Sequence, residues 1–238
     1  MVEIFKDPEA LSVAAAELFV AAAKKAIDEK GKFTVALTGG SSPAKLYKLL
    51  ASAPYSEQVD WQKVFVFWGD ERWVPLDDEK SNAKMTKELL LDQVNIPKNQ
   101  IFPMWADGKE PESFAKEYAE LLHSQLGSSG SFDLIFLGMG DDGHTASLFP
   151  GTAVLAETEK WVAAYFLVPQ DMYRITLTAP VLNKAKQTVV LVFGANKAKA
   201  FHEVQHGTYN PELYPSQLLK PEADSELIWF VDSAAAEN

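Results

Sequence analysis

The chain has 238 residues, of which 47% are hydrophobic and 23% are charged, and it contains no cysteine. That much apolar material supports a sizeable core, and we expect one globular unit over residues 1–238. The lack of cysteine excludes disulfides, thiolate metal ligands and cysteine nucleophiles. The formal net charge of -11 repels nucleic acid and anionic membranes, so we expect neither as a partner.

No apolar run reaches the roughly 20 residues of a membrane helix, and the first residues lack the basic, apolar and small-residue order of a secretory signal. We therefore expect a soluble protein of the cytoplasm. An anionic small molecule binds such an acidic protein only where local basic groups and backbone N–H groups outweigh the overall field. Each well-placed Arg or Lys is therefore a candidate for ligand binding.

The first predicted element is a long helix. Asp7 suits the N-cap, Pro8 suits the first helical position, and Lys30 precedes a terminating Gly31. Apolar runs then alternate with helical segments. In chain order we expect a strand at 33–37, a helix at 44–51, a strand at 64–68, a helix at 82–91, strands at 132–137, 161–167 and 188–193, a helix at 195–204 and a strand at 227–231.

Near-continuous apolar strands separated by helices predict an α/β fold. We expect a mostly parallel, Rossmann-like sheet flanked by helices on both faces, with a smaller subsidiary lobe. Ligands of such sheets bind beyond the carboxyl ends of the strands. Three glycine-rich or charged segments directly follow predicted strands, so the sheet should gather them into one crevice.

The first of these segments reads TGGSSP at positions 38–43. Glycines let backbone N–H groups approach a ligand closely, and the helix that follows presents its positive end to an anion. Gly39, Gly40 and Ser41 are therefore phosphate-binding candidates. The alternative is an ordinary strand-to-helix turn with Ser42 as N-cap. Neither a Walker A loop nor a GxGxxG pattern is present.

The second segment places three consecutive charges, Asp70, Glu71 and Arg72, directly after the strand at 64–68. Arg72 suits a carboxylate or the oxyanion of a tetrahedral intermediate, while Asp70 and Glu71 suit the orientation of partners by charge-assisted hydrogen bonds. The alternative is a solvated loop with an internal ion pair. The flanking tryptophans are interpreted as packing residues.

The third segment, LGMGDDGHT at 137–145, carries a histidine and two acids in a glycine-rich turn. Neutral His144 can take a proton from water, and a nearby carboxylate can set its tautomer and stabilise the imidazolium. Asp142 is the better candidate for that carboxylate. The alternative is a loop histidine without chemistry.

Two later basic residues could also face the crevice: Arg174 precedes a predicted helix, and Lys197 follows the strand predicted at 188–193. Binding of a phosphate dianion would explain why both positions are basic. Each is by itself equally compatible with a solvated surface charge. The other histidines lack the spaced acidic partners of a metal site, so we expect no metal. No serine lies in a nucleophile elbow, so a serine hydrolase triad fits poorly.

Together these motifs resemble the 6-phosphogluconolactonases of the glucosamine/galactosamine-6-phosphate isomerase superfamily. The matching motifs occur in the family's order: GGSSP at 39–43, GDERWVP at 69–75, GMGDDGHTASLFPG at 138–151, RITLT at 174–178 and GANKAKAF at 194–201. The resemblance spans positions 10–232. The family more often has a histidine where this chain has Tyr173, so we assign that position no role.

The resemblance implies hydrolysis of 6-phosphoglucono-δ-lactone to 6-phosphogluconate in the oxidative pentose phosphate pathway, without cofactor or metal. By motif, His144 would activate water and Asp142 would orient His144. Arg72 would position His144 or the substrate. The residues that would bind the phosphate are Gly39, Gly40, Ser41, Arg174 and Lys197.

Two alternative functions remain open at this stage. A glucosamine-6-phosphate deaminase or isomerase resembles the chain in its glycine loop, Asp-Glu pair and Asp-Gly-His. The deaminase pattern, however, has a glutamate five residues after the histidine, where this chain has Phe149, and a tyrosine at the position of Arg72. A catalytically idle sugar-phosphate sensor is the other alternative, and an intact His144 argues against it.

Overall fold

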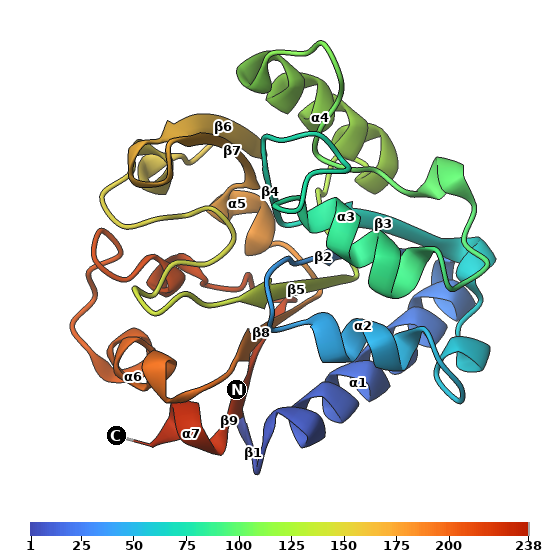
Figure 1. Cartoon of the computed structure of the whole chain (residues 1–238), viewed down its shortest axis with the longest axis horizontal. Helices are drawn as coiled ribbons and strands as arrows, with labels where there is room; N and C mark the ends of the chain where they lie inside the picture. The colour runs from blue at the N-terminus through green and yellow to red at the C-terminus, as the bar shows by residue number, and fades with distance from the viewer. Residues whose placement is uncertain (238) are drawn as a thin grey trace.

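The computed structural model describes residues 1–237, and its main feature is a six-stranded sheet in the order β1-β9-β8-β5-β2-β3 (Figure 1). Its strands are β1 (Val2–Phe5), β2 (Phe33–Leu37), β3 (Val64–Trp68), β5 (Leu134–Gly138), β8 (Gln187–Val192) and β9 (Glu226–Asp232). Each neighbouring pair is parallel. The expected parallel α/β sheet is confirmed.

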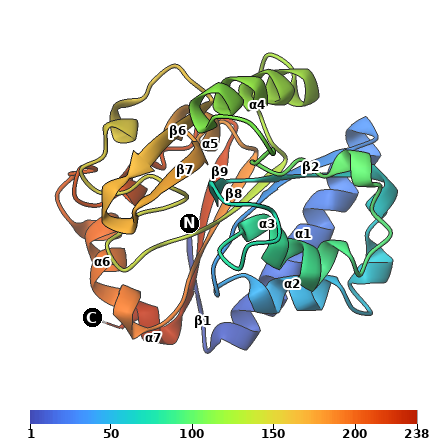
Figure 2. The ribbon, with the colours of Figure 1, turned by 45° about the horizontal axis from the view of Figure 1, so that its top comes forward.

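Helices cover both faces of this sheet. They are α1 (Pro8–Lys30), α2 (Ala44–Leu50), α3 (Asn82–Thr86), α4 (Pro111–Leu126), α5 (Ala179–Leu182), α6 (Ala198–His206) and α7 (Ser233–Ala236). Figure 2 shows α1 and α2 on one side of the sheet and α6 and α7 on the other.

The long helix α1 begins and ends as its sequence predicts. The Asp7 side chain accepts the backbone N–H of Ala10 at 2.8 Å, and Gly31 closes the helix in the left-handed region with φ 77°. Phe19 on its buried face lies 5.3 Å from the ring of Phe33 on β2 and 6.5 Å from Phe136 on β5. These aromatic contacts attach α1 to the two central strands.

The two central strands mark the point where the chain reverses its direction across the sheet. From β2 the chain adds β3 on one side, and it then returns to place β5, β8 and β9 on the other side of β2. Loops that leave the carboxyl ends of β2 and β5 diverge there, which opens a crevice at a topological switch point. The first and third candidate segments are these two loops.

A smaller antiparallel sheet forms the subsidiary lobe, in the order β4 (Asp70–Arg72), β7 (Met172–Leu177) and β6 (Val162–Leu167). Helix α4 packs against β6 (Figure 2). The strand expected at 161–167 is therefore found in this second sheet and not in the parallel one. Its apolar composition predicted a strand, but composition does not specify the partner strands.

Other elements differ from the expectation. Strands β1, β4 and β7 and helix α4 were not predicted as such, and the charged segment 70–72 is a buried strand where we considered a loop. The helix expected at 82–91 begins as α3 and continues as a π-helical turn at Lys87–Leu91. The helix expected at 195–204 begins with a 3₁₀ turn at Ala195–Lys197 and continues as α6.

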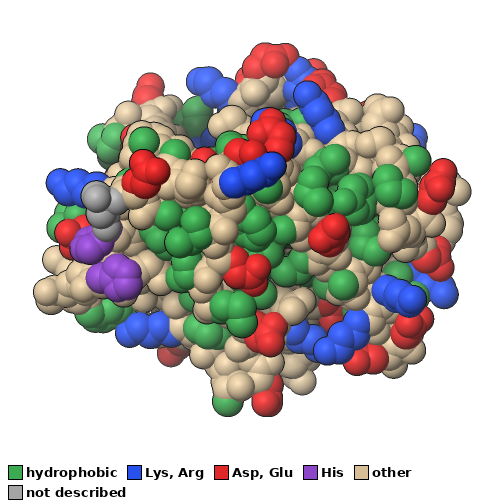
Figure 3. All heavy atoms as spheres, turned by 90° about the horizontal axis from the view of Figure 1, so that it is seen from below, with side chains coloured by type: hydrophobic (Ala, Val, Ile, Leu, Met, Phe, Trp, Pro, Cys, Tyr) green, Lys and Arg blue, Asp and Glu red, His purple; other side chains and the backbone are tan. Residues whose placement is uncertain are grey.

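Among residues 1–237, no helix combines the length and apolarity needed to cross a bilayer. On the face drawn in Figure 3, acidic, basic and hydrophobic side chains are interspersed, with no broad basic area. The charge of -11 is thus accompanied by mixed signs on that face.

Candidate active site

A pocket of about 200 Å³ lies at the carboxyl ends of β2 and β5. It brings together segments that are far apart in the sequence, from Thr38 to Lys197. Eight of the residues predicted for the site line it: Gly39, Gly40, Ser41, Asp70, Arg72, His144, Arg174 and Lys197. Asp142 and Glu71 do not line the pocket but contact residues that do.

His144 and Asp142 form a close pair in the loop after β5. The Nδ1 atom of His144 lies 2.6 Å from Oδ1 of Asp142, and the same oxygen accepts the backbone N–H of His144 at 3.0 Å. An ionised carboxylate only accepts hydrogen bonds, so Nδ1 carries the proton and Nε2 keeps its lone pair. Burial opposes ionisation of Asp142, but the hydrogen bond and charge of His144 outweigh it and hold its pKa below the usual value.

Phe149 packs on the imidazole from the same loop. The two rings are 4.0 Å apart at 25°, and the Phe149 ring also lies 5.5 Å from the Arg174 guanidinium. This stacking restricts the rotation of His144 about its side-chain bonds. The position at which the deaminase pattern has a glutamate is thus occupied by an apolar ring that packs on His144.

Asp70 and Arg174, which both line the pocket, form a buried ion pair. Nη2 of Arg174 lies 2.8 Å from Oδ2 of Asp70, and the Ser147 hydroxyl bridges the pair, donating to Asp70 at 2.5 Å and accepting from Nε of Arg174 at 2.8 Å. Burial raises the pKa of Asp70, but the charges of Arg174 and Arg72 and the hydrogen bond from Ser147 reverse the shift and lower it. The pair joins β4 to β7.

Glu71 is fully buried and holds the N-terminus of α3 against β4. Its carboxylate accepts the backbone N–H groups of Arg72, Asn82 and Ala83 at 2.7 to 2.8 Å and the Ser81 hydroxyl at 3.1 Å. Burial raises the pKa of Glu71 to about 7, against the opposing effect of these N–H groups. Glu71 therefore positions the residues that follow it in the site.

Arg72 extends from the end of β4 into the pocket. Its Nη1 donates to the carbonyl of Lys80 at 2.8 Å, and its buried Nε has no hydrogen-bond partner within residues 1–237. No hydrogen bond joins Arg72 to His144 in that part of the chain. A desolvated N–H donor without a partner favours binding of an acceptor on a ligand.

The pocket is also lined by the glycine-rich loop after β2 and by Lys197. Gly40 adopts φ 82°, which glycine tolerates without strain, and Ser41 is exposed beside it. Lys197 lies in the turn after β8 and forms no ion pair with any residue of the described chain 1–237. This arrangement of a lysine and a glycine loop suits an anion.

Asn82 is a pocket residue that the sequence analysis did not identify. It is 2% exposed and lies at the first position of α3. Its Nδ2 donates to the backbone carbonyl of Asp70 at 2.9 Å, whereas its Oδ1 has no hydrogen-bond partner in the described chain. The available signal was its place shortly after the charged segment, which is weak because helix N-termini are commonly polar.

Gly140 lies so close to His144 that a side chain cannot be added without movement. An ideal Cβ there would overlap Nδ1 and Cε1 of His144 and lie 2.5 Å from Oδ1 of Asp142. We expect Gly140→Ala to displace the imidazole and lower kcat about 100-fold, because a displacement of about 1 Å costs that much. Steady-state kinetics with the substrate proposed below measures the effect.

Gly138→Ala is the matched control for this prediction, since it adds the same methyl group two residues earlier. A Cβ at Gly138 has no heavy atom within 4 Å. Both variants should unfold within a few degrees of each other, with the larger loss of kcat in Gly140→Ala. Equal kcat for the two variants would contradict the argument.

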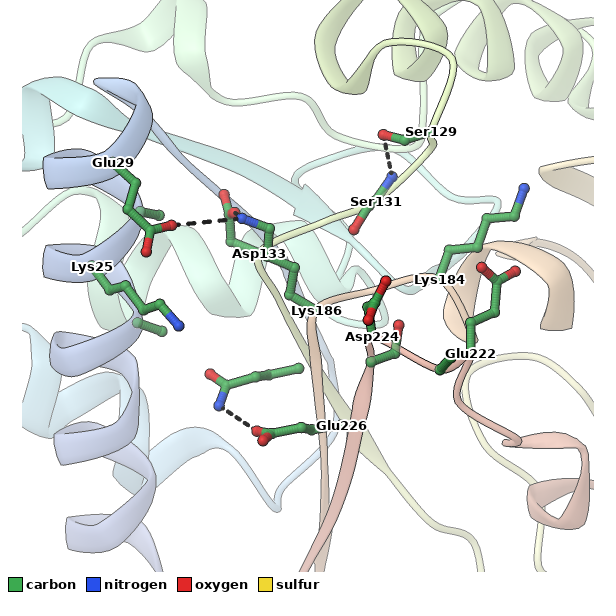
Figure 4. A pocket seen from close by; sticks show the side chains of 15 residues that line it. Lys25, Glu29, Ser129, Ser131, Asp133, Lys184, Lys186, Glu222, Asp224 and Glu226 are labelled. Carbon is green, nitrogen blue, oxygen red and sulfur yellow. Dashed lines mark hydrogen bonds and ion pairs between the residues drawn. The ribbon is translucent and has the colours of Figure 1, made fainter.

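A second pocket, of about 570 Å³, lies at the opposite, amino-terminal edge of the sheet (Figure 4). Three of its charged residues form ion pairs: Asp133 lies 2.9 Å from the neighbouring Lys30 and 3.5 Å from Lys186, and Lys186 lies 4.0 Å from Glu29. Its lining contains no histidine, and five acidic side chains outnumber three basic ones there. The pocket at His144 is therefore the better candidate for chemistry, although it is smaller.

The fold agrees with comparisons with known proteins. The profile of the family described as glucosamine-6-phosphate isomerases/6-phosphogluconolactonase matches residues 6–229. The chain belongs to this family.

Several relatives in the family are similar over almost their whole length. The chain is 41% identical over 218 residues to a 6-phosphogluconolactonase of Synechocystis sp., covering 90% of this chain and 88% of the relative. It is 37% identical to one of Nostoc sp., covering 98% and 96%. The solved 6-phosphogluconolactonase of Trypanosoma brucei superimposes with a TM-score of 0.85 at 27% identity, covering 99% and 97%.

Membership confirms the resemblance found in the sequence motifs. The description of the family joins two different activities, so the fold does not choose between them. The choice rests on the side chains of the pocket.

Proposed function

We propose that this protein is a 6-phosphogluconolactonase of the cytoplasm, which opens 6-phospho-D-glucono-1,5-lactone to 6-phospho-D-gluconate in the oxidative pentose phosphate pathway. The observation that carries the proposal is the His144–Asp142 pair, 2.6 Å apart, in a pocket that also presents unpaired basic groups. The relatives named 6-phosphogluconolactonase support it.

His144 acts first as a general base and then as a general acid. Its Nε2 takes a proton from water as the water oxygen attacks C1, and the carbonyl oxygen becomes an oxyanion. The intermediate then collapses, the bond from C1 to the ring oxygen breaks, and His144 returns the proton to that oxygen. Asp142 stabilises the imidazolium between the two steps. The acid product then loses its own proton to solvent.

Arg72 is our candidate for the oxyanion contact. Its buried Nε is a donor with no protein partner, and a charged donor held in place in advance stabilises charge that develops in the transition state. The carbonyl of Lys80 fixes one end of the guanidinium, at 2.8 Å from Nη1. This restraint lowers the reorganisation needed during reaction.

The phosphate group binds at the glycine-rich loop of Gly39, Gly40 and Ser41, and Lys197 supplies positive charge. Arg174 contributes to the field, but Asp70 compensates much of its charge at 2.8 Å. Lys197 is therefore the principal cation for the phosphate in this proposal.

The alternative of a glucosamine-6-phosphate deaminase is less well supported. That reaction requires a proton-transferring group for ring opening, whereas the position five residues after His144 holds Phe149, whose ring stacks on the imidazole at 4.0 Å. A hydrocarbon ring transfers no protons. A sugar-phosphate sensor would not require the close pair of His144 and Asp142.

The deciding experiment measures proton release from freshly prepared 6-phosphogluconolactone, corrected for spontaneous opening, beside ammonia release from glucosamine 6-phosphate. We expect acceleration of the first reaction and none of the second. Glucono-1,5-lactone without phosphate is the control substrate, and its kcat/KM should be much lower because the phosphate contacts are lost. Ammonia release would identify the deaminase, and saturable binding without turnover would identify the sensor.

A further inference from the structure

Asn82, a residue that lines the pocket, carries a buried hydrogen-bond acceptor without a partner in the described chain. The residue is 2% exposed, it lines the pocket, and its Oδ1 has no partner within residues 1–237. Buried polar atoms are almost always hydrogen-bonded, because burial without a partner costs the full desolvation of the atom. An unpartnered atom at a ligand pocket therefore indicates a contact that the ligand completes.

The orientation of this amide is determined by its neighbours. Nδ2 donates to the backbone carbonyl of Asp70 at 2.9 Å and faces a carboxylate oxygen of the same residue at 3.4 Å. Both are acceptors, so the nitrogen must point to them and the oxygen must point away. The oxygen lies against Gly39, where an added Cβ would overlap it. Asn82 Oδ1 therefore lies beside the glycine-rich loop.

The polar groups around it are mostly donors or are already engaged. Arg72 and Lys197 can only donate, and Oδ2 of Asp70 is used by Arg174 and Ser147. Nε2 of His144 is the atom that takes the proton from water in the proposed reaction. Asn82 Oδ1 is thus a buried side-chain acceptor of a pocket residue that no group of the described chain uses.

We propose that Asn82 Oδ1 accepts a hydrogen bond from one ring hydroxyl of the sugar lactone and so determines specificity for that hydroxyl. This inference rests on the proposed function for the identity of the sugar. The phosphate dianion, the lactone carbonyl and the ring oxygen only accept hydrogen bonds, so the hydroxyls at C2, C3 and C4 are the donors that the substrate offers. A sugar that lacks the matching hydroxyl leaves Asn82 Oδ1 unsatisfied in a dehydrated pocket.

The test compares 6-phosphogluconolactone with its 2-deoxy, 3-deoxy and 4-deoxy analogues. For the unmodified protein we expect kcat/KM to fall about 10- to 100-fold with one analogue, since a site built for a hydroxyl rejects the analogue without it. In Asn82→Ala the difference between that analogue and the full substrate should shrink to within about threefold. Asn82→Ser serves the same purpose if the alanine variant does not fold.

Thr86→Val is the matched control on the same helix. The Thr86 hydroxyl donates to the backbone carbonyl of Asn82 at 2.9 Å and accepts from Trp68 at 3.2 Å, and it does not line the pocket. This variant disturbs α3 but keeps the Asn82 amide, so its discrimination between substrates should equal that of the unmodified protein. A purely structural role of Asn82 would lower kcat/KM for all four sugars by one factor.

The inference is overturned if the unmodified protein treats all the analogues alike, or if Asn82→Ala retains the full discrimination. Failure of the proposed function is read separately, from the absence of any acceleration of lactone opening. In that case, calorimetric binding of 6-phosphogluconate and its three monodeoxy forms, which needs no turnover, tests the hydroxyl contact by the same criteria.

Discussion

Replacement of His144 by alanine is expected to lower kcat for lactone opening by about 10²- to 10⁴-fold, the usual contribution of a general base. KM should change little, because the proposed phosphate contacts are made by the glycine-rich loop and Lys197 and not by His144. The loss should follow from the missing Nε2 lone pair and not from disruption of the fold, since the side chain is 27% exposed. Single-turnover and steady-state rates, corrected for spontaneous opening, measure it.

His123→Ala is the matched control for this variant. His123 also stacks on an aromatic ring, that of Trp161 at 3.6 Å, as His144 does on Phe149 at 4.0 Å, but it lies on α4 and does not line the pocket. We expect kcat to remain within about twofold of the unmodified protein. A His144→Ala protein that retains its turnover, or an equal loss in both variants, would remove His144 from the mechanism.

Replacement of Asp70 by asparagine is expected to cost about 3–5 kcal/mol of the free energy of unfolding. The variant keeps the shape of the side chain but leaves the Arg174 guanidinium, whose side chain is 4% exposed, without its counter-charge. The expected loss is large because desolvation of an unpaired buried charge is expensive. Urea unfolding followed by tryptophan fluorescence measures it.

The exposed pair of Lys109 and Glu117 provides the control. Its N–O distance is 2.8 Å, equal to that between Arg174 and Asp70, but both side chains are 46% exposed. Glu117→Gln should therefore change the free energy of unfolding by less than about 1 kcal/mol. Similar losses in Asp70→Asn and Glu117→Gln would show that burial of the first pair contributes little.

The unmodified protein and Asp70→Asn should also differ in how their free energy of unfolding depends on pH. The pKa of Asp70 is lowered in the folded protein, so its contribution is present above the unfolded pKa of about 3.8 and is lost as pH falls through the lower folded value. The unmodified protein should therefore lose stability in acid more steeply than Asp70→Asn does. The difference between their unfolding free energies should narrow as the pH falls below about 4.

Local sequence patterns predicted the parallel sheet and most of the pocket. An apolar run such as 33–37 followed by glycines specifies a strand and a turn through short-range preferences, and parallel strands necessarily bring their carboxyl ends to one edge. Gly39, Arg72 and His144 lie two, four and six residues after the parallel strands β2, β3 and β5, so their meeting could be inferred without the tertiary structure.

The partners of individual charges could not be inferred in this way. Asp70 and Arg174 are 104 positions apart, and their ion pair forms because β4 pairs with β7 in the second sheet. Neither strand was predicted. Segment 70–72 consists of three consecutive charges and shows no alternation, whereas residues 173–177 do alternate between apolar and polar side chains, a strand signal that our prediction did not use. The predicted phosphate ligand Arg174 is thus found committed in part to Asp70, which only the tertiary arrangement decides.

Asn82 shows most clearly the difference between what local sequence determines and what tertiary packing decides. The sequence by itself determined the α/β class, the glycine loops and the candidate base, because these depend on periodicity, turn chemistry and residue type within a few positions. Only the tertiary structure decided that Glu71 holds the start of α3 and that Asn82 lines the pocket with a buried oxygen that has no partner in the described chain. Burial and partner choice arise when distant segments pack, and no short window of sequence contains that information.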